Sequence, residues 1–250
     1  MKNEVRQNLK IIGTNSASGG RYIDAKVIGN GLITGDLECV TFKGVGDSRL
    51  QGNLKAGTAK ITGSLHVEGK AAVDDMRVTG DLNLDGDFHA RQCHLRGGLT
   101  TKAGVKADDL SLIGNITVKK NCEAETFNGE GQIRIDGLLN ADRIEIKTYG
   151  ASRISEIGGD RIDIGKGSAT SFGKMIKVLF VPSSWGNATL TVNSIEGDDI
   201  RLSSTRARVV RGNNVVIESG CEIDLVEYTG SLKINRGAEV KEKKKMGVRE

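Results

Sequence analysis

The chain has 250 residues, of which 34 are glycine, one is proline and only 4% are aromatic. Its formal net charge is +4, and residues 241–250 supply most of it, so the remainder is nearly neutral and lacks the basic footprint of a nucleic-acid-binding protein. The sequence has neither an apolar run of about eighteen residues nor a signal-peptide core near its start, which excludes a spanning helix and makes the cytoplasm the expected location.

The first segment, residues 1–20, is polar and ends rich in glycine, and it is expected to be a flexible tail. Alternation of apolar and polar residues begins after Arg21. Residues 21–164 then form an internal repeat in which glycine returns every seventeen residues. The repeating glycines are Gly29, Gly46, Gly63, Gly80, Gly97, Gly114 and Gly131.

Taking this glycine as position 1, apolar residues recur at positions 3 and 5, 9 and 11, and 14 and 16 of each unit. The unit that begins at Gly80 supplies Leu82, Leu84, Phe88, Ala90, Cys93 and Leu95 at these positions. A spacing of two is strand periodicity, and both members of a pair face the same side. Three short strands per unit predict an all-β fold: a single-stranded, right-handed parallel β-helix with triangular rungs of seventeen residues.

The repeat is interrupted over residues 165–194, which are expected to form an insertion or flap. This segment holds the only proline and the only tryptophan, Trp185, together with Phe180. Residues 195–240 are expected to return to the β-helix, with Val215 and Ile217 at positions 3 and 5 of a new rung. Residues 241–250 are expected to be a solvated basic tail.

The residues that could carry chemistry do not converge. The three histidines fall at outward positions on three different faces, so they cannot share a metal ion or form a proton relay. Paired aspartates at Asp74–Asp75 and Asp108–Asp109 lie at corners, where turn solvation is favoured over sugar cleavage. The cysteines fit inward positions as reduced, buried thiols. The sequence therefore predicts no catalytic, cofactor-binding or metal-binding residues and no small-molecule substrate.

One outward column is partly basic. Lys43, Lys60 and Arg77 occupy position 15 of successive rungs and are expected to stack at a spacing of about 4.8 Å. This stripe, with Phe180 and Trp185 of the flap, is the candidate contact with a membrane or partner. An ordinary solvated face is the alternative interpretation.

The repeated units ITGSLHVEG (61–69) and VTGDLNLDG (78–86) resemble those of the bactofilins, the polymer-forming cytoskeletal proteins of bacteria. The resemblance covers residues 21–164, and residues 194–228 look like the longer Gram-positive members. It implies self-assembly into nucleotide-independent filaments without enzymatic activity, a scaffold role in cell shape, envelope or appendage machinery, and frequent association with the inner face of the membrane or with envelope proteins.

The ends of a β-helix support this implication, because terminal rungs leave strand edges and apolar interior exposed. The expected polymerisation interface consists of Ile23, Ala25 and Val27 at one end and Leu232, Ile234 and Val240 at the other. A polysaccharide-binding or carbohydrate-active module that uses the Trp185 flap is the competing class, although sugar platforms usually need more aromatic rings. A hexapeptide-repeat acyltransferase is disfavoured because its rungs have eighteen residues.

Overall fold

The computed structural model describes residues 7–167 and 189–247, and within these ranges it contains strands and no helix. The strands lie parallel to their neighbours, and each of β2 to β5 runs through two corners of the solenoid and ends at the third. Their bounds are β1 Gln7–Gln51, β2 Leu54–Val67, β3 Ala71–Leu84, β4 Phe88–Thr101, β5 Val105–Val118, β6 Cys122–Thr148, β7 Ser152–Lys166, β8 Leu190–Leu202, β9 Thr205–Ile217, β10 Glu222–Ile234 and β11 Glu239–Lys245. The predicted parallel β-solenoid is confirmed.

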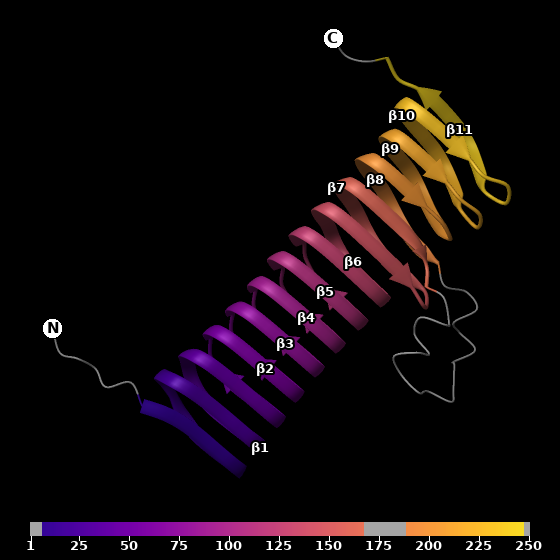
Figure 1. The fold of residues 1–250 in the computed structure, drawn as a ribbon. Coiled ribbons are helices and arrows are strands. Elements are labelled where there is room, and N and C mark those ends of the chain that lie inside the picture. Colours follow the sequence, from indigo (N-terminus) through magenta and orange to yellow (C-terminus); the bar gives the residue numbers. More distant parts are fainter. Residues whose placement is uncertain (1–6, 168–188, 248–250) are drawn as a thin grey trace. The chain divides into compact units, whose positions relative to one another are not determined.

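The chain divides into two compact units. Unit 1 comprises Met1–Ile113 with Thr117–Lys120, and unit 2 comprises Gly114–Ile116 with Asn121–Glu250. Strands β1 to β4 and most of β5 belong to unit 1, and β6 to β11 belong to unit 2. Within each unit, strands that follow one another in the chain lie side by side (Figure 1).

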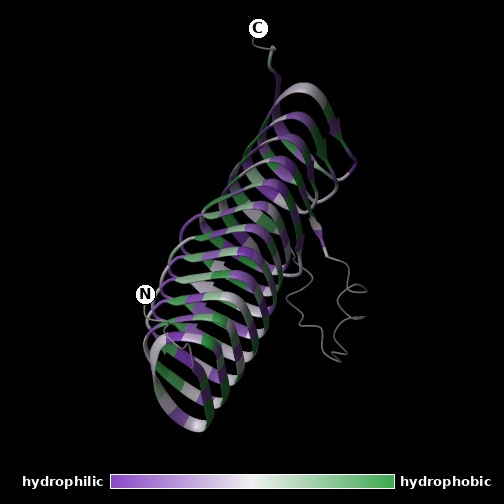
Figure 2. Cartoon of the chain, turned by 60° about the vertical axis from the view of Figure 1, so that its left-hand side comes forward, coloured by the Kyte–Doolittle hydropathy of each residue, from purple (hydrophilic) through white to green (hydrophobic). Residues whose placement is uncertain are grey.

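The seventeen-residue period sets the strand pairing of unit 1. Leu37 pairs with Leu54, and Ala71 pairs with Phe88, each seventeen residues later. The inward positions are closed to solvent; Leu82, for example, is 0% exposed. Figure 2 shows the resulting alternation of hydrophilic and hydrophobic residues along the rungs. The repeat therefore stacks equivalent residues and buries one continuous apolar column per side within the unit.

Glycine is needed at two corners for different reasons. The position-1 glycines adopt φ between +100° and +137° from Gly46 to Gly131, a region that side chains disfavour. At position 7, Gly35 has a positive φ but Gly52, Gly69 and Gly86 do not. A Cβ atom on Gly69 would lie 2.6 Å from the Gly52 carbonyl oxygen, and one on Gly86 would lie 2.7 Å from that of Gly69. These glycines are required because successive backbones approach closely.

Two of the buried phenylalanine rings fit this thin core beside a glycine on the same side of the rung. Phe127 is fully buried at position 14, and Gly129 stands at position 16 of the same side. A Cβ atom on Gly129 would lie 2.8 Å from the Phe127 ring and 2.6 Å from the Ile133 side chain. Phe42 and Gly44 repeat the arrangement in unit 1. The glycine thus supplies the volume that the ring occupies, which keeps the interior close-packed.

Polar side chains at position 8 connect one rung to the next in unit 1. The Asn53 backbone N–H donates to Asp36 Oδ1 (2.7 Å), and the Asn53 side-chain amide donates to the same oxygen (3.0 Å). The Lys70 backbone N–H in turn donates to Asn53 Oδ1 (2.8 Å). The corner amides of Asn53 and Lys70 are therefore each satisfied by a short polar side chain of the preceding rung.

Both predicted tails were partly wrong. Residues 7–20 belong to β1, where the Asp24 backbone N–H donates to Asn8 Oδ1 (3.3 Å), so this segment is a rung rather than a tail. Residues 241–245 belong to β11, which pairs with β10. Of the predicted flap, residues 165–166 end β7 and residues 190–194 begin β8. Residues 1–6, 168–188 and 248–250 lie outside the described residues.

The register of unit 2 corrects the expected phase. Val215 pairs with Ile200, which pairs with Ile162, which pairs with Ile144, so Val215 and Ile217 take positions 14 and 16 rather than 3 and 5. The rung between β8 and β9 contains fifteen residues, as Leu190 pairs with Thr205. The three sides of a rung all carry apolar residues two apart, so they can be told apart only by counting residues from a known corner. The insertion interrupts that count.

Candidate functional site

The N-terminal residues predicted to form an assembly interface are not at a tip. Ala25 and Val27 are 1% and 0% exposed. They are covered because the rung of residues 7–20 precedes them, and its Ile11 is itself buried. Only Ile23, at 45% exposure, remains available to a partner. The prediction for Ala25 and Val27 was wrong, because it placed the first rung one turn too late.

The C-terminal prediction falls on the last rung. We call Leu232, Ile234, Val240 and strand β11 the C-terminal tip. Ile234 is 39% exposed, and Leu232 and Val240 are half-buried. The equivalent residues one rung earlier, Val215 and Ile217, are both 0% exposed. The tip therefore presents to solvent the same apolar columns that the interior of unit 2 buries.

The third side of the C-terminal tip is cationic. Lys243 pairs with Val226, and Lys245 pairs with Tyr228, so lysines occupy the inward places of this column. Both lysines are exposed. Inward-pointing charge on an edge strand is a recognised way of discouraging further strand pairing. The tip is therefore apolar on two sides and basic on the third.

The predicted basic stripe is assembled as expected. Lys43 pairs with Lys60, Lys60 with Arg77, and Arg77 with His94, and all four side chains are exposed. We call Lys43, Lys60 and Arg77 the cation ladder. Arg77 forms an ion pair with Asp75 (3.2 Å) on its own strand. Phe180 and Trp185, the other predicted contact residues, lie outside the described residues.

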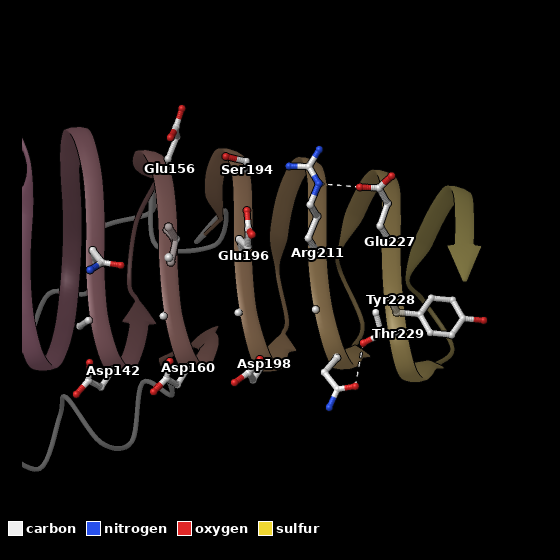
Figure 3. Close-up of a pocket in the computed structure, with 18 of the residues that line it drawn as sticks. Asp142, Glu156, Asp160, Ser194, Glu196, Asp198, Arg211, Glu227, Tyr228 and Thr229 are labelled. Carbon is white, nitrogen blue, oxygen red and sulfur yellow. Dashed lines mark hydrogen bonds and ion pairs between the residues drawn. The ribbon is translucent and has the colours of Figure 1, made fainter. Parts of the chain in front are cut away.

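Sequence reasoning missed a groove on unit 2, which we call the glycine groove (Figure 3). Its volume is about 1050 Å³. Its floor is the position-11 column, where Gly159 pairs with Gly197 and Gly197 pairs with Gly212, and Tyr228 takes the next place. A Cβ atom on Gly159 or Gly197 would press on a backbone carbonyl oxygen of the preceding rung. Close contact between rungs thus requires glycine at these positions. Because glycine has no side chain, the surface above this column is hollow and forms the groove.

Acidic side chains line both sides of the glycine groove (Figure 3). One side carries Asp142, Asp160 and Asp198, which we call the carboxylate ladder. The other carries Glu156 and Glu227 among its residues. Arg211 also lines the groove, but its charge is met by Glu227 at 2.7 Å. The groove is therefore suited to cationic rather than anionic groups. The signal in the sequence was the recurrent Gly-Asp of residues 159–160 and 197–198, which the insertion separates.

Among the other groups with shifted pKa values, Asp85 and the cysteines have structural surroundings rather than a shared site. Asp85 accepts a hydrogen bond from Lys102, and this bond, with His66 nearby, holds the pKa of its carboxyl below the ordinary value. Burial raises the pKa of Cys93 to about 12 and that of Cys39 to about 11. All four cysteines are buried free thiols, as predicted.

In residues 7–167 and 189–247, no group of three or more His, Cys, Asp or Glu side chains is placed to hold a metal ion. The same ranges contain no helix long and apolar enough to cross a membrane.

The chain is similar to two curated proteins of Bacillus subtilis (strain 168). "Uncharacterized protein YhbE" is 37% identical over 116 residues, which is 45% of each chain. "Uncharacterized protein YhbF" is 33% identical over 111 residues, which is 44% of this chain and 42% of that protein. The chain thus matches less than half the length of either relative. No family model matches the chain, and no solved structure matches it.

Proposed function

We propose that the protein is a non-enzymatic structural protein that joins end to end into filaments. The C-terminal tip carries this proposal, because Ile234 is 39% exposed whereas Ile217, directly beneath it in the same column, is 0% exposed. A further rung from another copy would bury Ile234 as the interior buries Ile217. Full burial of such a side chain is worth about 1.5–3 kcal/mol.

The unpaired edge adds to the apolar contribution. Among the described strands β11 pairs only with β10, so its outer backbone N–H and C=O groups are free to extend the sheet. The resemblance to the bactofilins supports the same function, with a cytoplasmic scaffold for cell shape, envelope or appendage machinery as the proposed role. A nucleotide has no part in such assembly, and the principal partner is the protein itself.

The test adds a charge to the C-terminal tip. Ile234→Lys is expected to give a folded, soluble, short species, because joining would then bury an ammonium group without a partner. Thr100→Lys adds the same charge to an exposed position on the side of a rung in unit 1 and is the matched control. Sedimentation velocity should show polymers for the control and the wild type only. Polymers of unchanged size in Ile234→Lys would refute the proposal.

The choice of variant matters at the other end. Val27→Lys would place a charge at a position with 0% exposure, so it is expected to unfold unit 1 rather than to block assembly. Ile23→Lys would leave the interior intact, because Ile23 is 45% exposed, but Ile23 is not at a tip and its substitution does not test end-to-end joining.

A further inference from the structure

Several charged side chains of unit 1 meet an opposite charge on a neighbouring rung. Glu38 lies between Arg21 (3.1 Å) and Lys55 (3.8 Å) in one column. Asp85 contacts His66 (3.4 Å) of the preceding rung and Lys102 (2.9 Å) of the following rung. Opposite charges on facing residues of adjacent strands stabilise a sheet, and like charges destabilise it. Alternation is therefore the arrangement that folding alone favours.

The cation ladder breaks this pattern. Lys43, Lys60 and Arg77 face one another directly in consecutive strands. Within the described part of the chain, the only ion pair formed by these three side chains is that of Arg77 with Asp75 on the same strand. Stability of the rung stack gives no reason for this column of like charge. Its positive charge is available to another molecule.

Exposed apolar residues accompany the cation ladder. Val45 is 37% exposed and lies two residues after Lys43, on the same side of the strand. Val40 and Ile23, seventeen residues apart at the neighbouring corner, are 52% and 45% exposed. Cations beside exposed β-branched residues form a surface typical of an interface rather than of a solvated face.

The glycine groove offers the complementary surface. Asp160 and Asp198 occupy equivalent places, since the residues on either side of them pair as Gly159 with Gly197 and Arg161 with Asp199. Each rung therefore contributes one aspartate to the carboxylate ladder, as each rung contributes one cation to the cation ladder. Parallel strands share a spacing of about 4.8 Å, so three cations and three carboxylates match in register. The glycine floor leaves room for long lysine stems between the acidic sides.

We propose that the cation ladder of one copy docks along the glycine groove of a second copy of this chain. The contact is lateral: it joins unit 1 of one molecule to unit 2 of another. It is independent of end-to-end joining through the C-terminal tip and would place neighbouring filaments side by side. Charge pairing at the rung spacing sets the register of the contact.

A second copy fits this surface better than a bilayer does. A flat anionic membrane would meet Asp75 on the same side of the strand as Arg77. Among the described residues of unit 1, the columns of Lys43 and Val45 contain no Phe, Tyr or Trp that could enter the membrane interface. A partner with carboxylates in a single column meets the cations alone. The carboxylate ladder is such a column.

The test is made in the full chain carrying Ile234→Lys, which removes end contacts, by sedimentation equilibrium at low salt. This background is expected to self-associate, with dimerisation as the first step. Adding Lys43→Glu with Lys60→Glu, or Asp160→Lys with Asp198→Lys, should weaken dimerisation at least tenfold. An equimolar mixture of the two reversed variants should restore a mixed dimer. Lys55→Glu with Lys70→Glu changes the charge of unit 1 equally on other columns and should not reproduce the tenfold loss.

Other outcomes would overturn the lateral contact. These are a monomeric background at low salt, reversed variants that dimerise like the background, or a mixture that stays monomeric. Binding to anionic phosphatidylserine vesicles that depends on Lys43 and Lys60, with unchanged dimerisation, would assign the surface to a membrane and would also overturn it. Polymers in the Ile234→Lys background would count against the end contact alone. The lateral contact would then be tested by comparing the width of these polymers with the width of polymers formed by the charge-reversed variants.

Discussion

At the scale of single residues, the thinness of the core decides which side chains are tolerated. Inward positions accept thiols as small apolar groups; Cys93 and Cys122 are both 0% exposed. Burial raises the pKa of each to about 12 because the apolar interior disfavours the thiolate. The sequence could predict this from the inward positions alone, because a thiol at such a position meets only neighbouring rungs.

These thiols are therefore expected to be inert in the folded chain. A disulfide reagent at mildly alkaline pH should react slowly with the native protein and rapidly with four thiols after denaturation. The raised pKa values also make folding less favourable at high pH. The stabilising difference is present below the ordinary thiol pKa and is lost as the pH rises towards 11 to 12. Rapid reaction of all four thiols in native protein would contradict the buried placement.

A second prediction concerns the ring that glycine accommodates. Gly129→Val should lower the free energy of unfolding by about 1–3 kcal/mol, because its side chain would overlap Phe127 and Ile133. Adding Phe127→Leu should recover part of the loss, which urea titration of both single variants and the double variant would measure. Gly150→Ala is the control, since a Cβ atom there meets nothing within 4 Å. If the losses in the free energy of unfolding were additive in the double variant, residues 127 and 129 would not compete for the same space.

At the scale of the strand, polar columns as well as apolar ones join one rung to the next. Asn53 takes part in three hydrogen bonds that join its rung to the two neighbouring rungs. Asn53→Ala should lower the free energy of unfolding by about 1–3 kcal/mol, at roughly 0.5–1.5 kcal/mol for each net hydrogen bond. Asn83→Ala, at a half-buried position of the same unit, is the comparison. Equal urea midpoints for the two variants would show that the position-8 column contributes nothing.

The period of seventeen was sufficient to predict the strands and corners of unit 1 from Gly29 onwards, because the rungs there repeat the same count. It was insufficient in unit 2, where a fifteen-residue rung and an insertion left Val215 without a defined side. The segment of residues 7–20 was misjudged for another reason. Its glycines and polar residues suggested disorder, whereas Ile11 is buried by stacking on the next rung. The composition of the segment alone does not indicate that packing against the next rung will order it.

The candidate sites of unit 1 were likewise easier to predict from the sequence than those of unit 2. The stacking of Lys43 on Lys60 followed directly from the period and is confirmed. The glycine groove depends on residues of β6 to β10 that come together only in the correct register of unit 2. The exposure of Ile234 was predictable from its place in the last rung, but the lysines of β11 were expected to lie in a tail.

At the scale of the whole molecule, the lysines of β11 are expected to limit assembly. Lys243→Val with Lys245→Val makes the third side of the C-terminal tip apolar, so polymers should appear at a lower protein concentration. Lys244→Val removes one charge from the neighbouring outward position and should have a smaller effect. Light scattering against protein concentration would measure the onset. An unchanged or higher onset for the double variant would show that these lysines do not oppose joining.

The most direct test of end-to-end assembly is electron microscopy of the purified wild-type chain without added nucleotide. The account predicts filaments of varied length whose subunits follow one another along the filament axis. It also predicts a repeat of about 4.8 Å along that axis, since the rungs of each copy would stack on those of the next. Particles of a single length, equal to that of one chain and unchanged as the protein concentration rises, would contradict it.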